Sequence, residues 1–175
     1  MKNILRYILG YIIGAAIFAV LIPWAVIKIS QVDPFYIPAG TEMLPLRIVI
    51  ALPLFTIGVL FILWSNLSLL TIGKGGPTDG FNVAISPRTK KLVISGPYRY
   101  TRNPMVFGAL SLYCSIGLFQ LSVLSLLCLL IFFLLIVQYL KRTEELRLLR
   151  DFGGEFIAYK NTVPMIFPFR RRQRK

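Results

Sequence analysis

The stretch PMVFGALSLYCSIGLFQLSVLSLLCLLIFFLLIVQYL, residues 104–140, contains no charged side chain. As one straight α-helix it would be about 55 Å long, whereas the hydrocarbon core of a bilayer is about 30 Å thick. The stretch must therefore fold back on itself. Gln120 and Ser122 interrupt the apolar run near residues 117–122. This predicts a helical hairpin with a short first arm and a second arm near residues 121–140.

Two further apolar runs precede the hairpin, at residues 7–29 and 46–73, and each is long enough to cross a bilayer. The first run is longer than the apolar part of a signal peptide, and no small-x-small cleavage site follows it, so we interpret it as a transmembrane helix. Within the second run, Asn66 is expected to form an interhelical hydrogen bond or to contact a ligand. The sequence thus predicts about four transmembrane helices.

The distribution of charge predicts how these helices are oriented. Lysine and arginine are concentrated in the N-terminus, in residues 74–102 and after residue 140, whereas residues 30–45 hold two acids and no base. By the positive-inside rule, both termini are expected in the cytoplasm of a multi-pass integral membrane protein. The expected location is the cell membrane of a bacterium or archaeon, or the endoplasmic reticulum of a eukaryote.

Composition supports this class and narrows the chemistry. The 175 residues are 56% hydrophobic with a net charge of +13, and the mean hydropathy is +0.70. There is no histidine, and both cysteines, Cys114 and Cys128, lie in apolar runs, so a disulfide framework or a metal site is not expected. Any chemistry must use carboxylate, tyrosine, arginine or a bound cofactor.

A basic, aromatic loop leads directly into the hairpin. In GPYRYTRNP, residues 96–104, Tyr98 and Tyr100 alternate with Arg99 and Arg102 between two prolines. Aromatic rings and long cations are both stable at the depth of the lipid headgroups. A fixed cationic and aromatic shape there suits a charged, partly planar ligand.

Beyond the hairpin, apolar residues recur at helical spacing. In KRTEELRLLRDFGGEFIAYK, residues 141–160, the periodic positions predict one amphipathic helix that continues straight out of the fourth transmembrane helix. The fold class is therefore an all-α membrane protein with a cytoplasmic C-terminal amphipathic helix. The RRRQRK tail, residues 170–175, is expected to bind anionic lipid rather than nucleic acid.

Glu144 and Glu145 lie at the start of this helix, and Glu145 falls on its apolar stripe. Both could be ordinary acids on the helix surface. An acid on an apolar stripe in so basic a protein nevertheless needs a partner. A bound cation, or an arginine such as Arg99 or Arg102, would provide one.

Together, GPYRYTRNPM, the hairpin and EELRLLRDFGGEFIAYKNTVP closely resemble the isoprenylcysteine carboxyl methyltransferase and phospholipid methyltransferase group of membrane enzymes, over residues 73–168. That family has the pattern GPY-x-x-x-R-[HN]-P-x-Y, a pair of glutamates and F-G-x-x-[YF]-x-x-Y, with S-adenosylmethionine bound between the two motifs. The resemblance implies a core at residues 74–175 preceded by two helices in residues 1–73. It implies a cofactor pocket formed by Tyr98, Arg102, Asn103 and Pro104 on one wall and by Glu144 and Glu145 on the other.

The resemblance also assigns roles to these residues. A glutamate would pair with the ammonium group of the cofactor, while Arg102 and the Asn103 amide would hold its carboxylate, with Arg102 and Glu145 as the catalytic pair. No metal is required. Two positions depart from the family pattern, because Asn103 replaces a frequent histidine and Val106 replaces the usual tyrosine.

We therefore expect an S-adenosylmethionine-dependent methyltransferase that contacts membrane lipids and acts on a lipophilic small-molecule or lipid-anchored acceptor. A carboxylate or thiol acceptor is slightly favoured over an amine, because no histidine is present to remove an amine proton. The alternatives are an NADPH-dependent membrane reductase of related architecture and a non-catalytic membrane scaffold.

Overall fold

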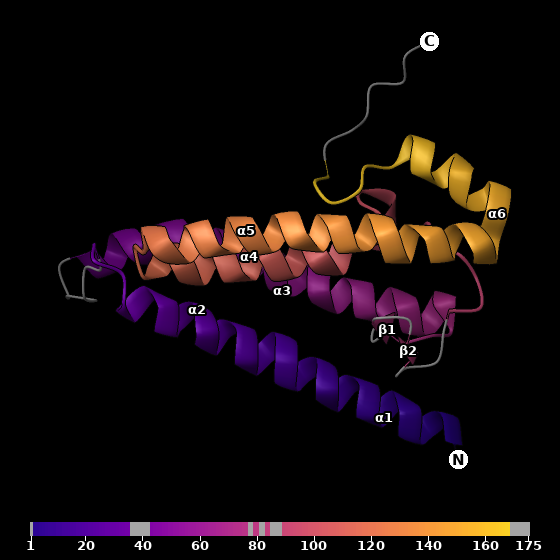
Figure 1. The fold of residues 1–175 in the computed structure, drawn as a ribbon, viewed down its shortest axis with the longest axis horizontal. Helices are drawn as coiled ribbons and strands as arrows, with labels where there is room; N and C mark the ends of the chain where they lie inside the picture. The colour runs from indigo at the N-terminus through magenta and orange to yellow at the C-terminus, as the bar shows by residue number, and fades with distance from the viewer. Residues whose placement is uncertain (1, 36–42, 77–78, 81–82, 85–88, 169–175) are drawn as a thin grey trace, which may run out of the picture.

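The computed structural model describes residues 2–35, 43–76, 79–80, 83–84 and 89–168 (Figure 1). The predicted basic tail, residues 170–175, lies outside this part of the chain. The described elements are α1 (Lys2–Gly14), a π-helical segment (Ala15–Leu21), α2 (Ile22–Gln31), α3 (Leu44–Ser68), a second π-helical segment (Leu69–Gly73), β1 (Asp79–Gly80), β2 (Val83–Ala84), a 3₁₀ turn (Gly96–Arg99), α4 (Pro104–Phe119), α5 (Val123–Tyr139), a third π-helical segment (Leu140–Glu144) and α6 (Glu145–Thr162). The fold is all-α, as expected, apart from the two short antiparallel strands.

Among the described residues, three helical stretches are long and apolar enough to cross a membrane: Tyr7–Gln31, Leu44–Gly73 and Val123–Thr162. The helix α4 is a shorter apolar helix. The hairpin is also confirmed, because α4 ends at Phe119 and α5 begins at Val123. The division at residue 73 and the cytoplasmic location of both termini stay predictions.

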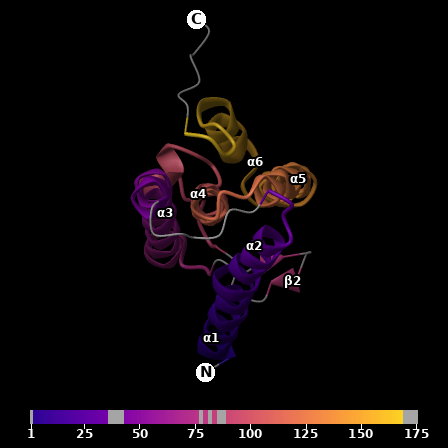
Figure 2. The ribbon, with the colours of Figure 1, turned by 90° about the vertical axis from the view of Figure 1, so that its left-hand side faces the viewer.

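The short helix α4 occupies the centre of the bundle, and Figure 2 shows it between α3 and α5 with α2 nearby. Its backbone touches that of α3 at a pair of glycines. A Cβ atom added to Gly108 would lie 2.8 Å from the carbonyl oxygen of Gly58, and one added to Gly58 would lie 2.8 Å from that of Gly108. Small residues at such crossings let membrane helices approach closely. The pair fixes the position of α4, whose N-terminus carries the basic loop.

The hairpin turn is held by residues from the two N-terminal helical stretches. Arg47 of α3 donates a hydrogen bond to the carbonyl oxygen of Phe119 at 3.0 Å. Asp33, just after α2, accepts hydrogen bonds from the Ser122 hydroxyl at 2.7 Å and from the backbone N–H of Leu124 at 2.9 Å. Both helix ends at the turn therefore have partners for their free backbone groups.

The hydrogen bonds to Asp33 predict a dependence of stability on pH. The bond from Ser122, followed by those from the backbone N–H groups of Leu124 and Phe35, holds the pKa of the Asp33 carboxyl below its usual value. Such a group stabilises the fold above its unfolded pKa of about 3.9, and this contribution is lost as the pH falls through the lower folded pKa. We expect Asp33→Asn to lower the apparent Tm at pH 6 and the difference from wild type to shrink towards pH 3. A difference that stays constant over this range would contradict the assignment.

The helix continues directly out of α5, as the sequence predicts, but it is not one unbroken helix over residues 141–160. The backbone of α6 departs from helical geometry at Gly153, with φ 52° and ψ −122°, and the chain turns back there (Figure 1). L-residues with a side chain rarely adopt a positive φ, so this reversal depends on glycine. Residues 154–162, which we call the return arm, run back along residues 145–152. Phe156 and Tyr159 of the expected apolar stripe are buried with Val163, and Leu148 and Phe152 from before the reversal pack against them.

Candidate functional site

The basic loop begins with a sharp turn against the end of α3. Gly96 has φ +62°, and a Cβ atom there would lie 2.9 Å from the Ser68 hydroxyl oxygen. The ring centroids of Trp64 and Tyr100 are 6.1 Å apart, and the Arg99 guanidinium lies 5.8 Å from the centroid of the Tyr100 ring. The turn at Gly96 and the contact between Trp64 and Tyr100 hold the loop against the end of α3, and Arg102 contacts Glu145 of α6.

Arg102 and Glu145 form the centre of the site. Nη1 of Arg102 lies 2.5 Å from Oε1 of Glu145, and the two side chains are only 8% and 11% exposed. Glu145 is therefore not a surface acid, and Arg102 is one of the partners predicted for it. The other carboxylate oxygen, Oε2, lies 2.6 Å from Nζ of Lys160. Sequence reasoning missed Lys160, because the contact exists only when α6 turns back.

A hydrogen bond between two tyrosines joins the return arm to the basic loop. The hydroxyl of Tyr159, on the return arm, donates a hydrogen bond to the carbonyl oxygen of Tyr98 at 2.6 Å. Burial, followed by the neighbouring Tyr159 hydroxyl and the Glu144 carboxylate, raises the pKa of the Tyr98 phenol, so Tyr98 stays neutral at physiological pH. The influence of Glu144 indicates that its carboxyl group lies near this ring. Glu144 is half-buried and has no hydrogen bond or ion pair with any residue that the structure describes.

Asn103 has a different contact from the one expected. Its side-chain amide donates to the carbonyl oxygen of Met165 at 2.9 Å, and that oxygen also accepts from the backbone N–H of Asn103 at 3.1 Å and from the Thr101 hydroxyl at 3.1 Å. The backbone N–H of Arg102 donates to the carbonyl oxygen of Pro164 at 2.9 Å. Asn103 thus fastens residues 163–168, the C-terminal segment, to the basic loop. Its predicted contact with a cofactor carboxylate stays a prediction.

Pro104 and Val106 lie at the start of α4, and the predicted contact of Pro104 with a cofactor stays a prediction. Pro104 is buried at the first turn of α4, where its missing N–H leaves no helical hydrogen bond unmade. Val106 packs in an apolar cluster with Leu110, Leu140 and Ile166. At the position where the family usually has tyrosine, this chain has a valine that joins α4 to the C-terminal segment.

The sequence comparison identifies the class of protein that carries this site. Residues 46–155, more than half of the chain, match the phospholipid methyltransferase family. The chain belongs to that family. The match includes the basic loop, the hairpin and both glutamates, whereas Tyr159, Lys160 and the C-terminal segment lie beyond it. Comparisons with curated proteins and with solved structures gave no significant match.

In this membrane methyltransferase, Asn66 of α3 forms no interhelical hydrogen bond with the residues that the structure describes. Its amide donates to the carbonyl oxygen of Ile62 in the same helix at 2.8 Å. Its side-chain oxygen is buried and has no partner among the described residues. The interhelical bond expected for Asn66 is therefore wrong, and a ligand contact stays a prediction.

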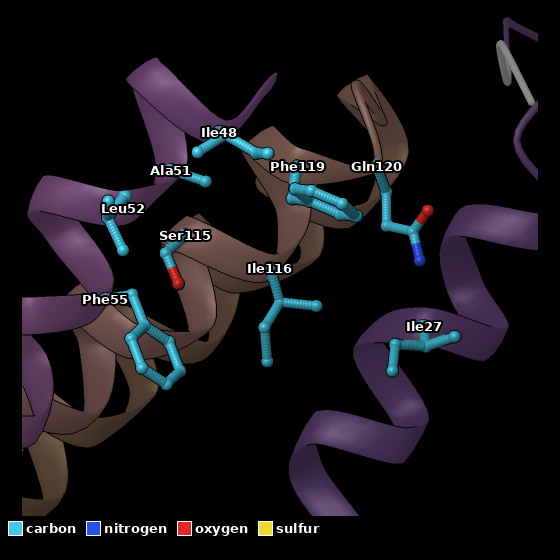
Figure 3. Close-up of a pocket in the computed structure, with 9 residues that line it drawn as sticks. All are labelled: Ile27, Ile48, Ala51, Leu52, Phe55, Ser115, Ile116, Phe119 and Gln120. Atoms are coloured by element: carbon cyan, nitrogen blue, oxygen red, sulfur yellow. The ribbon is translucent and has the colours of Figure 1, made fainter. Parts of the chain in front are cut away.

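A pocket of about 360 Å³ lies at the opposite end of α4 from Arg102, between α2, α3 and α4 (Figure 3). Its nine lining residues are Ile27, Ile48, Ala51, Leu52, Phe55, Ser115, Ile116, Phe119 and Gln120. Only Ser115 and Gln120 are polar. The pocket holds none of the predicted site residues and offers no charged group for a methyl-transfer reaction.

Proposed function

We propose that the chain is a methyltransferase that uses S-adenosylmethionine and methylates a lipophilic acceptor at the membrane surface. The observation that carries this proposal is the buried pair of Arg102 and Glu145 next to two tyrosines, within a member of the phospholipid methyltransferase family. The family supports methyl transfer. The residues of the site support the choice of cofactor.

The chemistry of the site fits the charged groups of S-adenosylmethionine. The Nε atom of Arg102 is buried and has no hydrogen-bond partner among the described residues, so it is available to a carboxylate. Glu145 and Glu144 suit an ammonium group, and the faces of Tyr98 and Tyr159 suit a cation or an adenine ring. When bound, S-adenosylmethionine supplies a methyl group attached to positively charged sulfur.

The protein's own part in the reaction is mainly alignment. Arg102 is fixed at its backbone by Pro164 and at its side chain by Glu145, so it can hold a carboxylate in one orientation. Tyr98 and Tyr159 remain neutral neighbours that exclude water. Glu145 already neutralises two cations, so Glu144 is the carboxyl group better placed to accept a proton from an acceptor.

The acceptor is proposed to reach the site from the bilayer, because the site lies where the apolar helix α4 begins and the apolar helix α5 ends. A carboxylate or a thiolate is already a nucleophile, whereas a lipid ammonium must first lose a proton. With no histidine in the chain, we favour a carboxylate or thiol acceptor. Substitution of Glu144 distinguishes these acceptors from an amine, because only an amine acceptor needs a base to remove its proton.

The cofactor is tested by calorimetric titration of S-adenosylhomocysteine into the detergent-purified protein. Saturable binding is expected. A well-folded protein that binds no S-adenosylhomocysteine would contradict the proposed function.

Glu144→Gln tests the acceptor class. The assay uses a saturating concentration of labelled S-adenosylmethionine, so that a weaker contact between residue 144 and its ammonium group does not limit the rate. For a carboxylate or thiol acceptor, methyl transfer to membrane lipid should then change by less than about threefold, whereas loss of a required base costs about 100-fold or more. Glu155→Gln, a change at an exposed acid on the return arm, is the matched control. Release of the label by mild alkali marks a methyl ester, and label that resists alkali together with a 100-fold loss in Glu144→Gln would identify an amine acceptor instead.

A further inference from the structure

We propose that Lys160 competes with the ammonium group of the cofactor for Glu145 and so sets how tightly this protein binds ammonium-bearing ligands. The inference rests on the proposed function and adds a residue outside the family match. Lys160 would then select against weak binders, because any ligand that pairs with Glu145 must first displace a resident cation.

The two carboxylate oxygens of Glu145 are both engaged. Oε1 faces Nη1 of Arg102 and Oε2 faces Nζ of Lys160. Because the Glu145 side chain is only 11% exposed, it has little room for a third cation. An ammonium group can form a charge-assisted hydrogen bond with this carboxylate only by replacing Arg102 or Lys160.

Lys160 is the partner that can be replaced. Its side chain is 47% exposed, whereas that of Arg102 is 8% exposed. Releasing Lys160 returns its charge to water at little cost, as for other exposed ion pairs. Releasing Arg102 would leave a buried guanidinium without its carboxylate, which costs far more.

The release of Lys160 does not require the return arm to move. The neighbouring Tyr159 stays hydrogen-bonded to Tyr98, and Phe156 is 2% exposed in the core beneath the arm. The long flexible side chain of Lys160 can turn into solvent while these contacts persist. The competition therefore concerns one side chain, and its effect should appear in binding constants without a loss of stability.

The test compares Lys160→Met with wild type by calorimetric titration of the detergent-purified protein. S-adenosylhomocysteine, which carries the ammonium group, should bind about two- to fivefold more tightly to the variant, because an exposed ion pair no longer has to be broken. Methylthioadenosine lacks the ammonium and carboxylate groups, so it should show no gain. Raising the salt concentration should reduce the gain for S-adenosylhomocysteine, because screening weakens the Lys160–Glu145 ion pair that only the wild type has to break.

Two further variants control for charge and fold. Lys160→Arg should keep the wild-type affinity, because arginine can make the same contact. Lys141→Met removes an equal charge from an exposed position before α6 and should leave the affinity unchanged. Equal or weaker binding of S-adenosylhomocysteine to Lys160→Met, or an equal gain for methylthioadenosine, would overturn the proposal. No binding to any folded variant would instead show that the proposed function has failed.

Discussion

Arg102→Ala is expected to abolish the binding of S-adenosylhomocysteine and to lower the apparent Tm of the purified protein by several degrees. Removing one partner of a buried ion pair costs about 3–5 kcal/mol, and the lower end applies here because Lys160 remains beside Glu145. The ligand loses its carboxylate partner at the same time. Calorimetric titration measures the first effect, and thermal unfolding in detergent measures the second.

A double-mutant cycle measures the interaction energy of the Arg102–Glu145 pair separately from the contribution of the rest of the loop. Glu145→Gln leaves Arg102 buried without its carboxylate and should also destabilise the protein, while the double variant should lose less than the sum of the two single losses. Arg99→Ala, at an exposed arginine of the same loop, should retain both stability and binding within about 0.5 kcal/mol. Normal ligand affinity in a folded Arg102→Ala protein would remove Arg102 from the binding site.

Gly108→Leu is expected to prevent assembly of the helical bundle. The first atom of the new side chain would lie 2.8 Å from the Gly58 carbonyl oxygen and 3.0 Å from the backbone nitrogen of Ile62. Backbone atoms cannot rotate out of the way as side-chain ends can, so α3 and α4 must separate along their length. Overpacking of this kind costs about 3 kcal/mol or more. The expected result is aggregated protein on size-exclusion chromatography in detergent.

Gly108→Ala and Gly154→Ala form a matched pair for this prediction. Both add one methyl group to a glycine of a helix, but a Cβ atom at Gly154 meets nothing within 4 Å. Gly154→Ala should therefore leave the apparent Tm unchanged or raise it slightly, because alanine favours helix. Gly108→Ala should lower it. Equal apparent Tm values for the two variants would show that the contact with Gly58 is not tight.

The hairpin and the ion pair could be predicted because each follows from one physical constraint. An uncharged run too long for the bilayer has to turn, and Gln120 and Ser122 mark where it does. A carboxylate on an apolar stripe needs a cation, and Arg102 is one of the two that the loop offered. Neither constraint depends on how distant parts of the chain meet.

The reversal at Gly153 could not be predicted from periodicity. The apolar residues on both sides of it face one shared core, so their spacing imitates that of a single helix. Lys160 and Glu145 are 15 residues apart, which is about 22 Å in a straight helix, yet they are in contact. The neighbouring glycines Gly153 and Gly154 were the only local signal. The bond from Asn103 to Met165 depends on the same reversal, so its partner was missed as well.

The Met165 carbonyl also determines when the basic loop acquires its shape during synthesis. Asn103 and Met165 are separated by 62 residues, so the loop emerges before Met165, whose carbonyl oxygen clamps the loop through hydrogen bonds, has been translated. At about 5–20 residues per second, the ribosome needs roughly 3–12 s to supply that clamp. During this interval the first helices can enter the bilayer; Glu145 follows Arg102 by 43 residues, so it is translated before Met165. Membrane insertion can therefore precede completion of the site during synthesis. We expect a product truncated before Met165 to insert its helices but to lack the hydrogen bonds from the basic loop to the Met165 carbonyl.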